Sequence, residues 1–268
     1  MSKNVHKREA WKVLYEEERK MKIVEYLQEN SRASVQELGK KFMVSDSTVR
    51  RDLKELEESR LLKRTHGGAV AADNVNFEPA FIEKEDKFCK EKKSIARKAV
   101  EFVEDGDTLV IDAGTTTAYL AKELRGRHNL KVVTNSLILA QELQGADNVE
   151  VILTGGTLRQ RTLSLVGPIA EQALSSLRVD KAIIATNGVD IDGGLTTPNV
   201  IEAAVKAKMI EIAQKVILVA DYSKVNKVAF AKFADMTQVD VFVVDDKIPQ
   251  ETVEKLNNLG VSVCIVTA

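Results

Sequence analysis

Apolar positions in the first 70 residues recur at helical spacing. They form three groups, which are Ile23, Tyr26 and Leu27, then Val35, Leu38 and Phe42, and then Val49, Leu53 and Leu56. Spacings of three and four residues place the members of each group on one face of a helix. The pattern therefore predicts three helices. Two short apolar stretches around Gly67 and Gly68 then predict a hairpin.

The second and third predicted helices carry N-terminal signals. Ser34 and Glu37 are spaced as a capping box, and Ser45 is a good N-cap residue directly after a Met43-Val44 turn. A helix, a tight turn, a second helix and a hairpin together are typical of a winged helix-turn-helix. We expect this domain over residues 1–70, with residues 1–17 as an N-terminal extension whose role the sequence does not decide.

From Thr108 onward the pattern changes to short, continuous apolar runs separated by polar turns and helical segments. The seven runs are Thr108 to Ile111, Leu130 to Val133, Val149 to Leu153, Lys181 to Ala185, Val216 to Ala220, Val241 to Val244 and Val261 to Val266. Buried strands that alternate with helices indicate a parallel sheet covered on both faces. The sequence predicts a doubly wound α/β domain over residues 81–268, with a helix from about Cys89 to Val103 before its first strand. A polar linker, 71–80, joins this domain to the head.

The composition is that of an ordinary globular protein in a reducing compartment. Hydrophobic residues make up 44% and charged residues 29% of the 268 positions. The two cysteines, Cys89 and Cys264, form neither a disulfide framework nor a zinc pair. No apolar run approaches the roughly 18 residues of a membrane span, and the start lacks a signal-peptide core. We expect a cytoplasmic protein with no membrane association.

The charge is distributed unevenly. Residues 1–70 hold 16 Lys and Arg against 12 Asp and Glu, a net charge of +4, whereas the remainder holds 23 against 28, a net charge of −5. A basic head on an acidic body indicates a polyanionic partner for the head alone.

The third predicted helix and the hairpin offer the chemistry of nucleic-acid binding. Arginine reads guanine bidentately in the major groove, and hydroxyls and lysine reach phosphates. The candidate DNA contacts are Ser45, Ser47, Thr48, Arg50, Arg51 and Lys54 on the helix, with Arg64 and His66 on the wing. The alternative is a solvated helix whose basic residues pair with Asp52, Glu55, Glu57 and Glu58.

In the body, the residue after each of five successive strands is polar. Ligands bind at the carboxyl ends of strands in an open parallel sheet, so these loops converge on a candidate site. The candidates are Asp112, Gly114, Thr115, Thr116, Thr117, Asn135, Gly155, Gly156, Arg159, Asp190 and Lys224. The alternative for each loop is ordinary turn and cap chemistry.

The loop after the first strand has the most specific chemistry. Gly114 followed by Thr115–Thr117 at a strand-to-helix junction exposes amides and hydroxyls that suit a phosphate. Lys224 and Arg159 supply cations. Asp112, Asn135 and Asp190 suit neighbouring hydroxyls, so the predicted ligand is a sugar phosphate.

No nucleotide-binding glycine signature and no metal-ligand cluster occur in the sequence, because the three histidines, His6, His66 and His128, lie far apart. We therefore expect neither a metal nor a cofactor, and no catalytic residue is assigned.

At these residues the chain resembles the DeoR-type bacterial transcriptional repressors of sugar metabolism. The motifs that carry the resemblance are Ser45–Leu53, His66–Ala69, Asp112–Thr117, Val133–Ser136, Gly155-Gly156 with Arg159, Gly167 and Ala220–Lys224. The resemblance implies a winged helix on operator DNA and a sensor similar in fold to ribose-5-phosphate isomerase. It also implies that Thr115, Thr116 and Thr117 hold an effector phosphate, with Asp112, Asn135, Asp190 and Lys224 around the sugar.

The function expected from these observations is a repressor of a sugar-utilisation operon, modulated by a phosphorylated sugar. A homo-oligomer is expected because a single winged helix makes few operator contacts. One alternative is a sugar-phosphate isomerase with a regulatory head, in which Glu202 is the best available general base unless it simply caps its helix or faces solvent. A further alternative is an activator, or a repressor that needs the ligand as its co-repressor. The sequence does not show whether ligand binding strengthens or weakens DNA binding.

Overall fold

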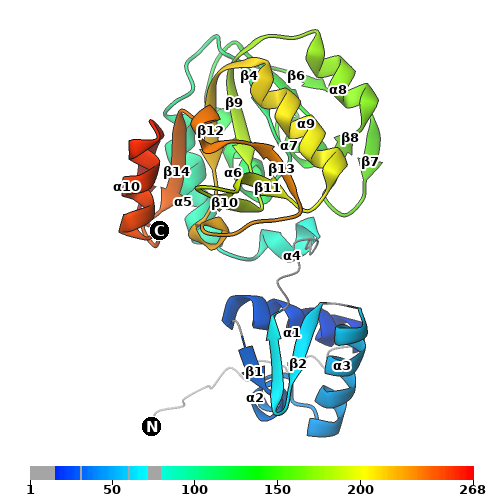
Figure 1. Cartoon of the computed structure of the whole chain (residues 1–268). Coiled ribbons are helices and arrows are strands. Elements are labelled where there is room, and N and C mark those ends of the chain that lie inside the picture. Colours follow the sequence, from blue (N-terminus) through cyan, green and yellow to red (C-terminus); the bar gives the residue numbers. More distant parts are fainter. Residues whose placement is uncertain (1–15, 31, 60, 72–79) are drawn as a thin grey trace, which may run out of the picture. The chain divides into compact units, whose positions relative to one another are not determined.

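The computed structural model describes residues 16–268 except 31, 60 and 72–79. The chain divides into two compact units, Met1–Asn74 and Val75–Ala268, which are described separately (Figure 1).

The first unit contains three helices and a small antiparallel sheet. In chain order its elements are α1 (Glu16–Asn30), β1 (Arg32–Ser34), α2 (Val35–Phe42), α3 (Asp46–Glu58), β2 (Leu62–Thr65) and β3 (Gly68–Ala71). The sheet order is β1-β3-β2. The three predicted helices and the hairpin are confirmed, and β1 is an addition that the sequence pattern did not predict.

Side-chain caps fix the N-termini of α2 and α3, as the sequence predicts. The amide of Glu37 donates to Ser34 Oγ at 3.1 Å, and the Glu37 carboxylate accepts from the Ser34 amide, which completes the capping box. The amide of Thr48 donates to Ser45 Oγ at 3.2 Å, so Ser45 caps α3. Met43, in the left-handed region at φ 53°, makes the tight turn between the two helices.

The wing turn lies one residue earlier than its glycine pair suggested. His66 and Gly67 form the two-residue turn, and Gly68 already pairs with Thr65 as the first residue of β3. A Cβ at Gly68 would lie 2.0 Å from the Ala33 carbonyl oxygen, whereas a Cβ at Gly67 would meet nothing within 4 Å. Gly68 therefore allows β1 to approach β3, and it is not part of the turn.

The core of the first unit combines apolar side chains with one buried ion pair. Ile23, Leu38 and Leu53, one from each helix, are fully buried. The Arg19 guanidinium donates to both carboxylate oxygens of Asp52, with Nε–Oδ2 at 2.6 Å and Nη2–Oδ1 at 3.0 Å. This bidentate pair joins α1 to α3.

The second unit is built on a seven-stranded parallel sheet. Its strands are β4 (Thr108–Ile111), β5 (Leu130–Thr134), β6 (Val149–Leu153), β9 (Val179–Ala185), β12 (Ala213–Val219), β14 (Val241–Asp245) and β15 (Ser262–Val266). Their order is β15-β14-β12-β9-β4-β5-β6. All seven predicted runs are strands of this sheet, which confirms the doubly wound fold.

Helices cover both faces of the sheet. One buried cluster includes side chains of α5 (Cys89–Val100), α6 (Thr115–Leu124) and α7 (Leu137–Glu142). The other includes side chains of α8 (Pro168–Ser175), α9 (Val200–Glu211) and α10 (Gln250–Asn258). Among the described helices, none has both the length and the apolar character that a membrane crossing requires.

Several short elements surround the sheet. A hairpin of β7 (Thr157–Arg159) and β8 (Ser164–Val166) follows β6, and a second antiparallel sheet contains β10 (Gly188–Asp190), β11 (Gly194–Thr197) and β13 (Ala231–Ala234). The remaining pieces are α4 (Phe81–Glu85) and the 3-10 turns η1 (Tyr222–Lys224) and η2 (Met236–Gln238). The expected extension, 1–17, and linker, 71–80, fall mostly outside the described residues.

Candidate functional site

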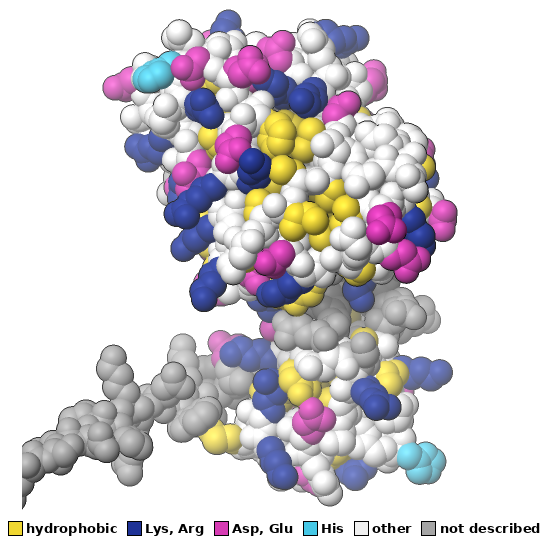
Figure 2. Space-filling model, turned by 90° about the vertical axis from the view of Figure 1, so that its left-hand side faces the viewer, with side chains coloured by type: hydrophobic (Ala, Val, Ile, Leu, Met, Phe, Trp, Pro, Cys, Tyr) yellow, Lys and Arg dark blue, Asp and Glu magenta, His cyan; other side chains and the backbone are white. Residues whose placement is uncertain are grey.

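Helix α3 presents its predicted DNA contacts on the surface. Arg50, Arg51 and Lys54 are exposed. Ser45 Oγ lies 2.8 Å from Ser47 Oγ and 2.8 Å from Thr48 Oγ1, so the three hydroxyls form one cluster at the start of the helix. Basic side chains are also prominent on the face of the first unit that Figure 2 shows.

Ion pairing along α3 is weaker than the solvated-helix alternative requires. Lys54 Nζ lies 3.9 Å from Glu58 Oε1, and Arg51 Nη2 lies 3.8 Å from Glu16 Oε2, both between exposed side chains. Asp52 instead pairs with Arg19, and Glu55 pairs with Lys20 at 2.5 Å. Asp52 and Glu55 of α3 therefore pair with α1, and Arg50, Arg51 and Lys54 stay exposed.

The wing carries Arg64 and His66, which are both exposed. Glu57, from α3, accepts from the Arg64 amide at 2.8 Å and lies 3.2 Å from Arg64 Nε. This contact ties the base of the wing to α3.

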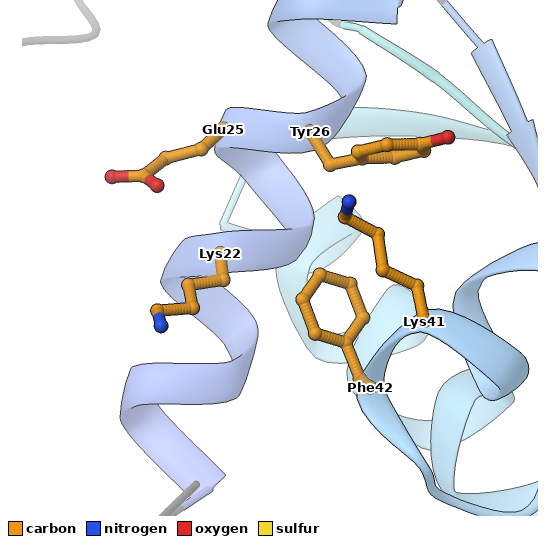
Figure 3. A pocket seen from close by; sticks show the side chains of 5 residues that line it. All are labelled: Lys22, Glu25, Tyr26, Lys41 and Phe42. Carbon is orange, nitrogen blue, oxygen red and sulfur yellow. The ribbon is translucent and has the colours of Figure 1, made fainter. Parts of the chain in front are cut away.

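A small hollow between α1 and α2 is lined by Lys22, Glu25, Tyr26, Lys41 and Phe42 (Figure 3). Lys41 Nζ points toward the Tyr26 ring, 4.5 Å from its centroid. The Tyr26 hydroxyl donates to Glu37 Oε1 at 2.5 Å. Because Lys41 and Tyr26 already contact each other and Glu37 holds the Tyr26 hydroxyl, we assign no ligand to this hollow.

In the second unit, the strand order reverses between β4 and β9, and the carboxyl ends of these two strands flank the candidate site. Asp112, which follows β4, accepts from the Ala185 amide of β9 at 3.2 Å and from Lys206 Nζ. Lys206 also donates to the Ala185 carbonyl oxygen at 3.0 Å. Asp112 and Lys206 are both buried, so an internal ion pair joins β4, β9 and α9 at the reversal.

Helix α6 begins at this same place. Thr115 and Thr116 are 7% and 6% exposed, and their amides belong to the first turn, where helices leave amides without intrahelical partners. The Thr117 hydroxyl donates to the carbonyl oxygens of Asp112 at 2.7 Å and Gly114 at 3.0 Å. Thr117 therefore stabilises the loop, and Thr115 and Thr116 remain the better anion donors.

Neighbouring polar residues shape the loops. Asn135 Oδ1 accepts from the Ala113 amide at 3.0 Å. Asp190 Oδ1 accepts from the Gly193 amide at 2.7 Å, which closes the β10–β11 turn. Gly156, at φ 113°, would place a Cβ 2.6 Å from the Val166 carbonyl oxygen, so the turn that contains Gly155 and Gly156 requires glycine there.

Glu202 is buried beside the candidate site, although the expected ordinary roles for this residue were a helix cap or a solvent-facing side chain. Its carboxylate accepts from the Thr162 hydroxyl at 2.6 Å and the Ser164 hydroxyl at 3.1 Å, and it lies 2.7 Å from Arg159 Nη1. Burial opposes its ionisation, but Lys206, Thr162 and Arg159 together lower the pKa of Glu202 to about 2. The solvent-facing interpretation is wrong, and the side chain is a poor general base.

Two buried lysines were missed by the sequence analysis. Lys206 follows Glu202 by one helical turn on an otherwise apolar stretch of α9, which is the signal that could have identified it. Lys92, on α5, is 3% exposed and donates to the Lys84 carbonyl oxygen. Burial lowers the pKa of Lys92 to about 8, with Asp221 and Lys224 as charged neighbours. Lys224 itself is half-buried in η1.

No cluster of His, Cys, Asp and Glu in the described ranges has the arrangement of a metal site.

Two family models match the chain. Residues 19–75 match the DeoR-like helix-turn-helix domain, and residues 87–246 match the DeoR C terminal sensor domain.

Curated relatives match over nearly their full length. The HTH-type transcriptional regulator GlpR of Haloferax volcanii is 42% identical over 92% of this chain and 96% of its own. The glycerol-3-phosphate regulon repressor of Escherichia coli K12 is 34% identical over 88% and 93%. A putative aga operon transcriptional repressor of Escherichia coli O157:H7 is 33% identical over 93% of each chain.

Among solved structures, the ribose 5-phosphate isomerase of Methanocaldococcus jannaschii is 18% identical, with a TM-score of 0.37 over 50% of this chain and 53% of that chain. A TM-score this low supports no conclusion.

Proposed function

Because the chain belongs to the DeoR family of transcriptional regulators, we propose that it is a repressor whose operator binding is modulated by a phosphorylated sugar or polyol. The observation that carries this proposal is the strand-order reversal of the second unit, where a helix N-terminus and buried charged side chains meet. The curated relatives include repressors named for an aga operon and for a glycerol-3-phosphate regulon.

Operator recognition uses α3 in the major groove and the wing beside it. Arg50 and Arg51 read bases, and Ser47, Thr48 and Lys54 reach phosphates. Arg64 and His66 contact the backbone or the minor groove. The Ser45 hydroxyl caps α3, and it orients the hydroxyls of Ser47 and Thr48.

Effector recognition uses the amides and hydroxyls of Thr115 and Thr116 for the phosphate, with Lys224 as the cation. Asn135 faces the hydroxyl groups of the ligand with its side-chain amide nitrogen, because its oxygen already accepts from the Ala113 amide, and Asp190 faces them with Oδ2. The walls of the site are kept in shape by Asp112, Arg159, Gly155 and Gly156.

The protein is a regulator and not an enzyme. An isomerase needs a carboxylate base whose pKa suits proton transfer near neutral pH. Glu202 has a pKa of about 2 and is neutralised by Arg159 and Lys206, which supports a structural role.

We further propose that the protein acts in the cytoplasm as a homo-oligomer. Two winged helices spaced by one turn of DNA, or a multiple of it, provide the specificity that one head lacks. Figure 2 shows hydrophobic side chains gathered on one face of the second unit, which is the kind of surface that contacts between copies bury.

Thermal unfolding of the full chain tests the effector site. The panel contains glycerol 3-phosphate, several hexose phosphates, the matched unphosphorylated compounds and inorganic phosphate, and each compound is assayed afterwards for conversion. A ligand at about 100 times its dissociation constant adds about 2.7 kcal/mol, which is readily seen as a higher melting temperature. We expect stabilisation by one phosphorylated compound that is recovered unchanged. Conversion of the compound would instead favour the sugar-phosphate isomerase. If no compound stabilised the protein, the polar residues of the strand-end loops would serve only as turn and cap residues.

A further inference from the structure

Helix α4 is the described helix that directly follows residues 72–79, through which the chain runs from the first unit to the second (Figure 1). It is only five residues long, and no sequence pattern predicted it. Helices this short are not stable on their own, so contacts with the rest of the second unit must hold it in place.

Three hydrogen bonds fix α4, and all three use its backbone. The Phe81 amide donates to the Arg161 carbonyl oxygen at 2.8 Å, and the Phe81 side chain is 5% exposed. At the other end of α4, Lys92 Nζ donates to the Lys84 carbonyl oxygen. Cys89 Sγ lies 3.1 Å from the Glu85 carbonyl oxygen.

These contacts place α4 against the walls of the effector site. Arg161 belongs to the turn between β7 and β8, two residues from Arg159. Lys84 is among the cations that lower the pKa of Glu202, and α4 packs on α6, whose first turn holds Thr115 and Thr116. That turn is more than nine-tenths buried, so the phosphate donors of the site lie under cover in this conformation.

Lys92 joins α4 to the charged groups of the site. Its ammonium group bonds the Lys84 carbonyl oxygen, and its charge interacts with Asp221 and Lys224 at the end of β12. A carbonyl oxygen carries only a partial charge, so a phosphate that enters the site offers this buried ammonium a stronger partner.

We propose that α4 transmits occupancy of the effector site to the first unit, because a phosphate draws the Lys92 ammonium away from the Lys84 carbonyl oxygen and loosens α4. This inference rests on the proposed function. A ligand shifts a conformational equilibrium only when it binds the two states differently, and competition for Lys92 supplies that difference. The residues that respond lead directly into the segment that joins the two units.

Amide hydrogen exchange on the full chain tests the transmission. The probe is inorganic phosphate, compared with sodium chloride at equal ionic strength. We expect phosphate to slow exchange at residues 115–118 and to speed exchange at residues 81–85 at least threefold. Slowing at 115–118 with no change at 81–85 would overturn the role of α4. No slowing of exchange at 115–118 would count against the proposed effector site itself. In that case, operator binding by variants of Lys92 and Phe81 without any ligand decides the role of α4.

Lys92→Met removes the ammonium group and keeps most of the side-chain volume, and Lys90→Met on the same helix is its matched control because Lys90 is exposed. Operator DNA is first selected from a random pool with the unmodified protein. Without any ligand, we expect Lys92→Met to bind that DNA at least tenfold more weakly and to exchange rapidly at 81–85, whereas Lys90→Met behaves like the unmodified chain. Phe81→Ala loosens α4 by a separate route and should weaken operator binding similarly. Unchanged operator affinity in folded Lys92→Met and Phe81→Ala would refute the proposal.

Discussion

Lys206 is the residue on which the geometry of the proposed effector site depends most directly. It is buried together with Asp112, and it contacts both sides of the strand-order reversal through Asp112 and the Ala185 carbonyl oxygen. A buried ion pair of this kind contributes little net stability while intact, but removal of one partner leaves an uncompensated charge.

Lys206→Met should therefore lower the free energy of unfolding of the second unit by about 3–5 kcal/mol, measured by denaturant unfolding. Lys208→Met is the control, because Lys208 pairs with Glu211 at the surface. The double variant Lys206→Met with Asp112→Asn should recover part of the loss. Equal stability of Lys206→Met and Lys208→Met would show that the buried pair is not formed.

Lys92 makes stability depend on pH in a predictable direction. Its pKa is about 8 in the folded protein, against an ordinary value of 10.5, because it is buried. Below pH 8 both states carry the proton. Between about pH 8 and 10.5 the unfolded chain keeps a proton that the folded chain has released, so the free energy of unfolding rises with pH.

Lys92→Met should remove this rise. The difference in the free energy of unfolding between the unmodified chain and Lys92→Met should grow in favour of the unmodified chain by on the order of 2 kcal/mol from pH 7.5 to pH 9.5. Denaturant titrations at the two pH values measure it. A difference that does not change with pH would mean that the folded protein does not lower the pKa of Lys92.

At the scale of elements, the wing depends on the close approach of β1 to β3. Gly68→Ala places a methyl group within 2.0 Å of the Ala33 carbonyl oxygen, whereas Gly67→Ala meets nothing within 4 Å. Gly68→Ala should lower the stability of the first unit by at least about 1–3 kcal/mol, and Gly67→Ala should change it by less than about 0.5 kcal/mol. Thermal unfolding of the full chain, followed by operator binding, distinguishes them. Similar behaviour of the two variants would contradict the assignment of Gly68 to β3.

The sequence predicted long or periodic elements well and short ones poorly. All seven buried parallel strands were visible because continuous apolar runs mark strands covered on both faces. The three-residue strand β1 and the five-residue helix α4 have no period to detect, and contacts with distant residues create them. Asp112 was identified as a site residue, but its partner Lys206 lies 94 positions away, so only the fold brings the two together.

Polar residues at the strand ends predict where the candidate site lies, but not how each residue acts. Thr117 and Asp190 bond to their own loops, as the turn-chemistry alternative holds, whereas Asn135 bonds across to the loop that follows β4. Glu202 was misjudged because the position of a carboxylate on a helix does not reveal the hydroxyls that surround it in the fold.

At the scale of the whole molecule, the chain consists of two units with opposite net charge and separate chemistry. The basic unit exposes the basic side chains of α3, and the acidic unit gathers its loops at one edge of a sheet. Variants that remove a DNA contact or a ligand contact should therefore leave the chemistry of the other unit intact, whereas variants that loosen α4 should change operator binding from the second unit.

Arg51→Ala should weaken operator binding at least tenfold, because a bidentate arginine contributes about 1–3 kcal/mol to base discrimination. The variant should keep the melting-temperature response of the second unit to its phosphorylated ligand. Fluorescence anisotropy with a labelled operator and thermal unfolding measure the two properties. Normal operator affinity in this variant would refute the role of Arg51.

Lys224→Ala should show the reverse behaviour. It should bind the operator like the unmodified protein, because Lys224 lies in η1 of the second unit, outside both α3 and α4, and it should lose the response to the phosphorylated ligand. Lys227→Ala, at an exposed position three residues away, is the control. An unchanged ligand response in Lys224→Ala would exclude Lys224 from the effector site.

The most direct test of the whole account is the release of operator DNA by a ligand. The complex of the full chain with a selected, fluorescently labelled operator is titrated with each phosphorylated compound of the panel and with its unphosphorylated counterpart, and fluorescence anisotropy is recorded. The account predicts that one phosphorylated sugar or polyol releases the operator, that its unphosphorylated counterpart does not, and that the compound is recovered unchanged. An operator complex that no phosphorylated compound affects, or that phosphorylated and unphosphorylated forms release equally, would contradict it.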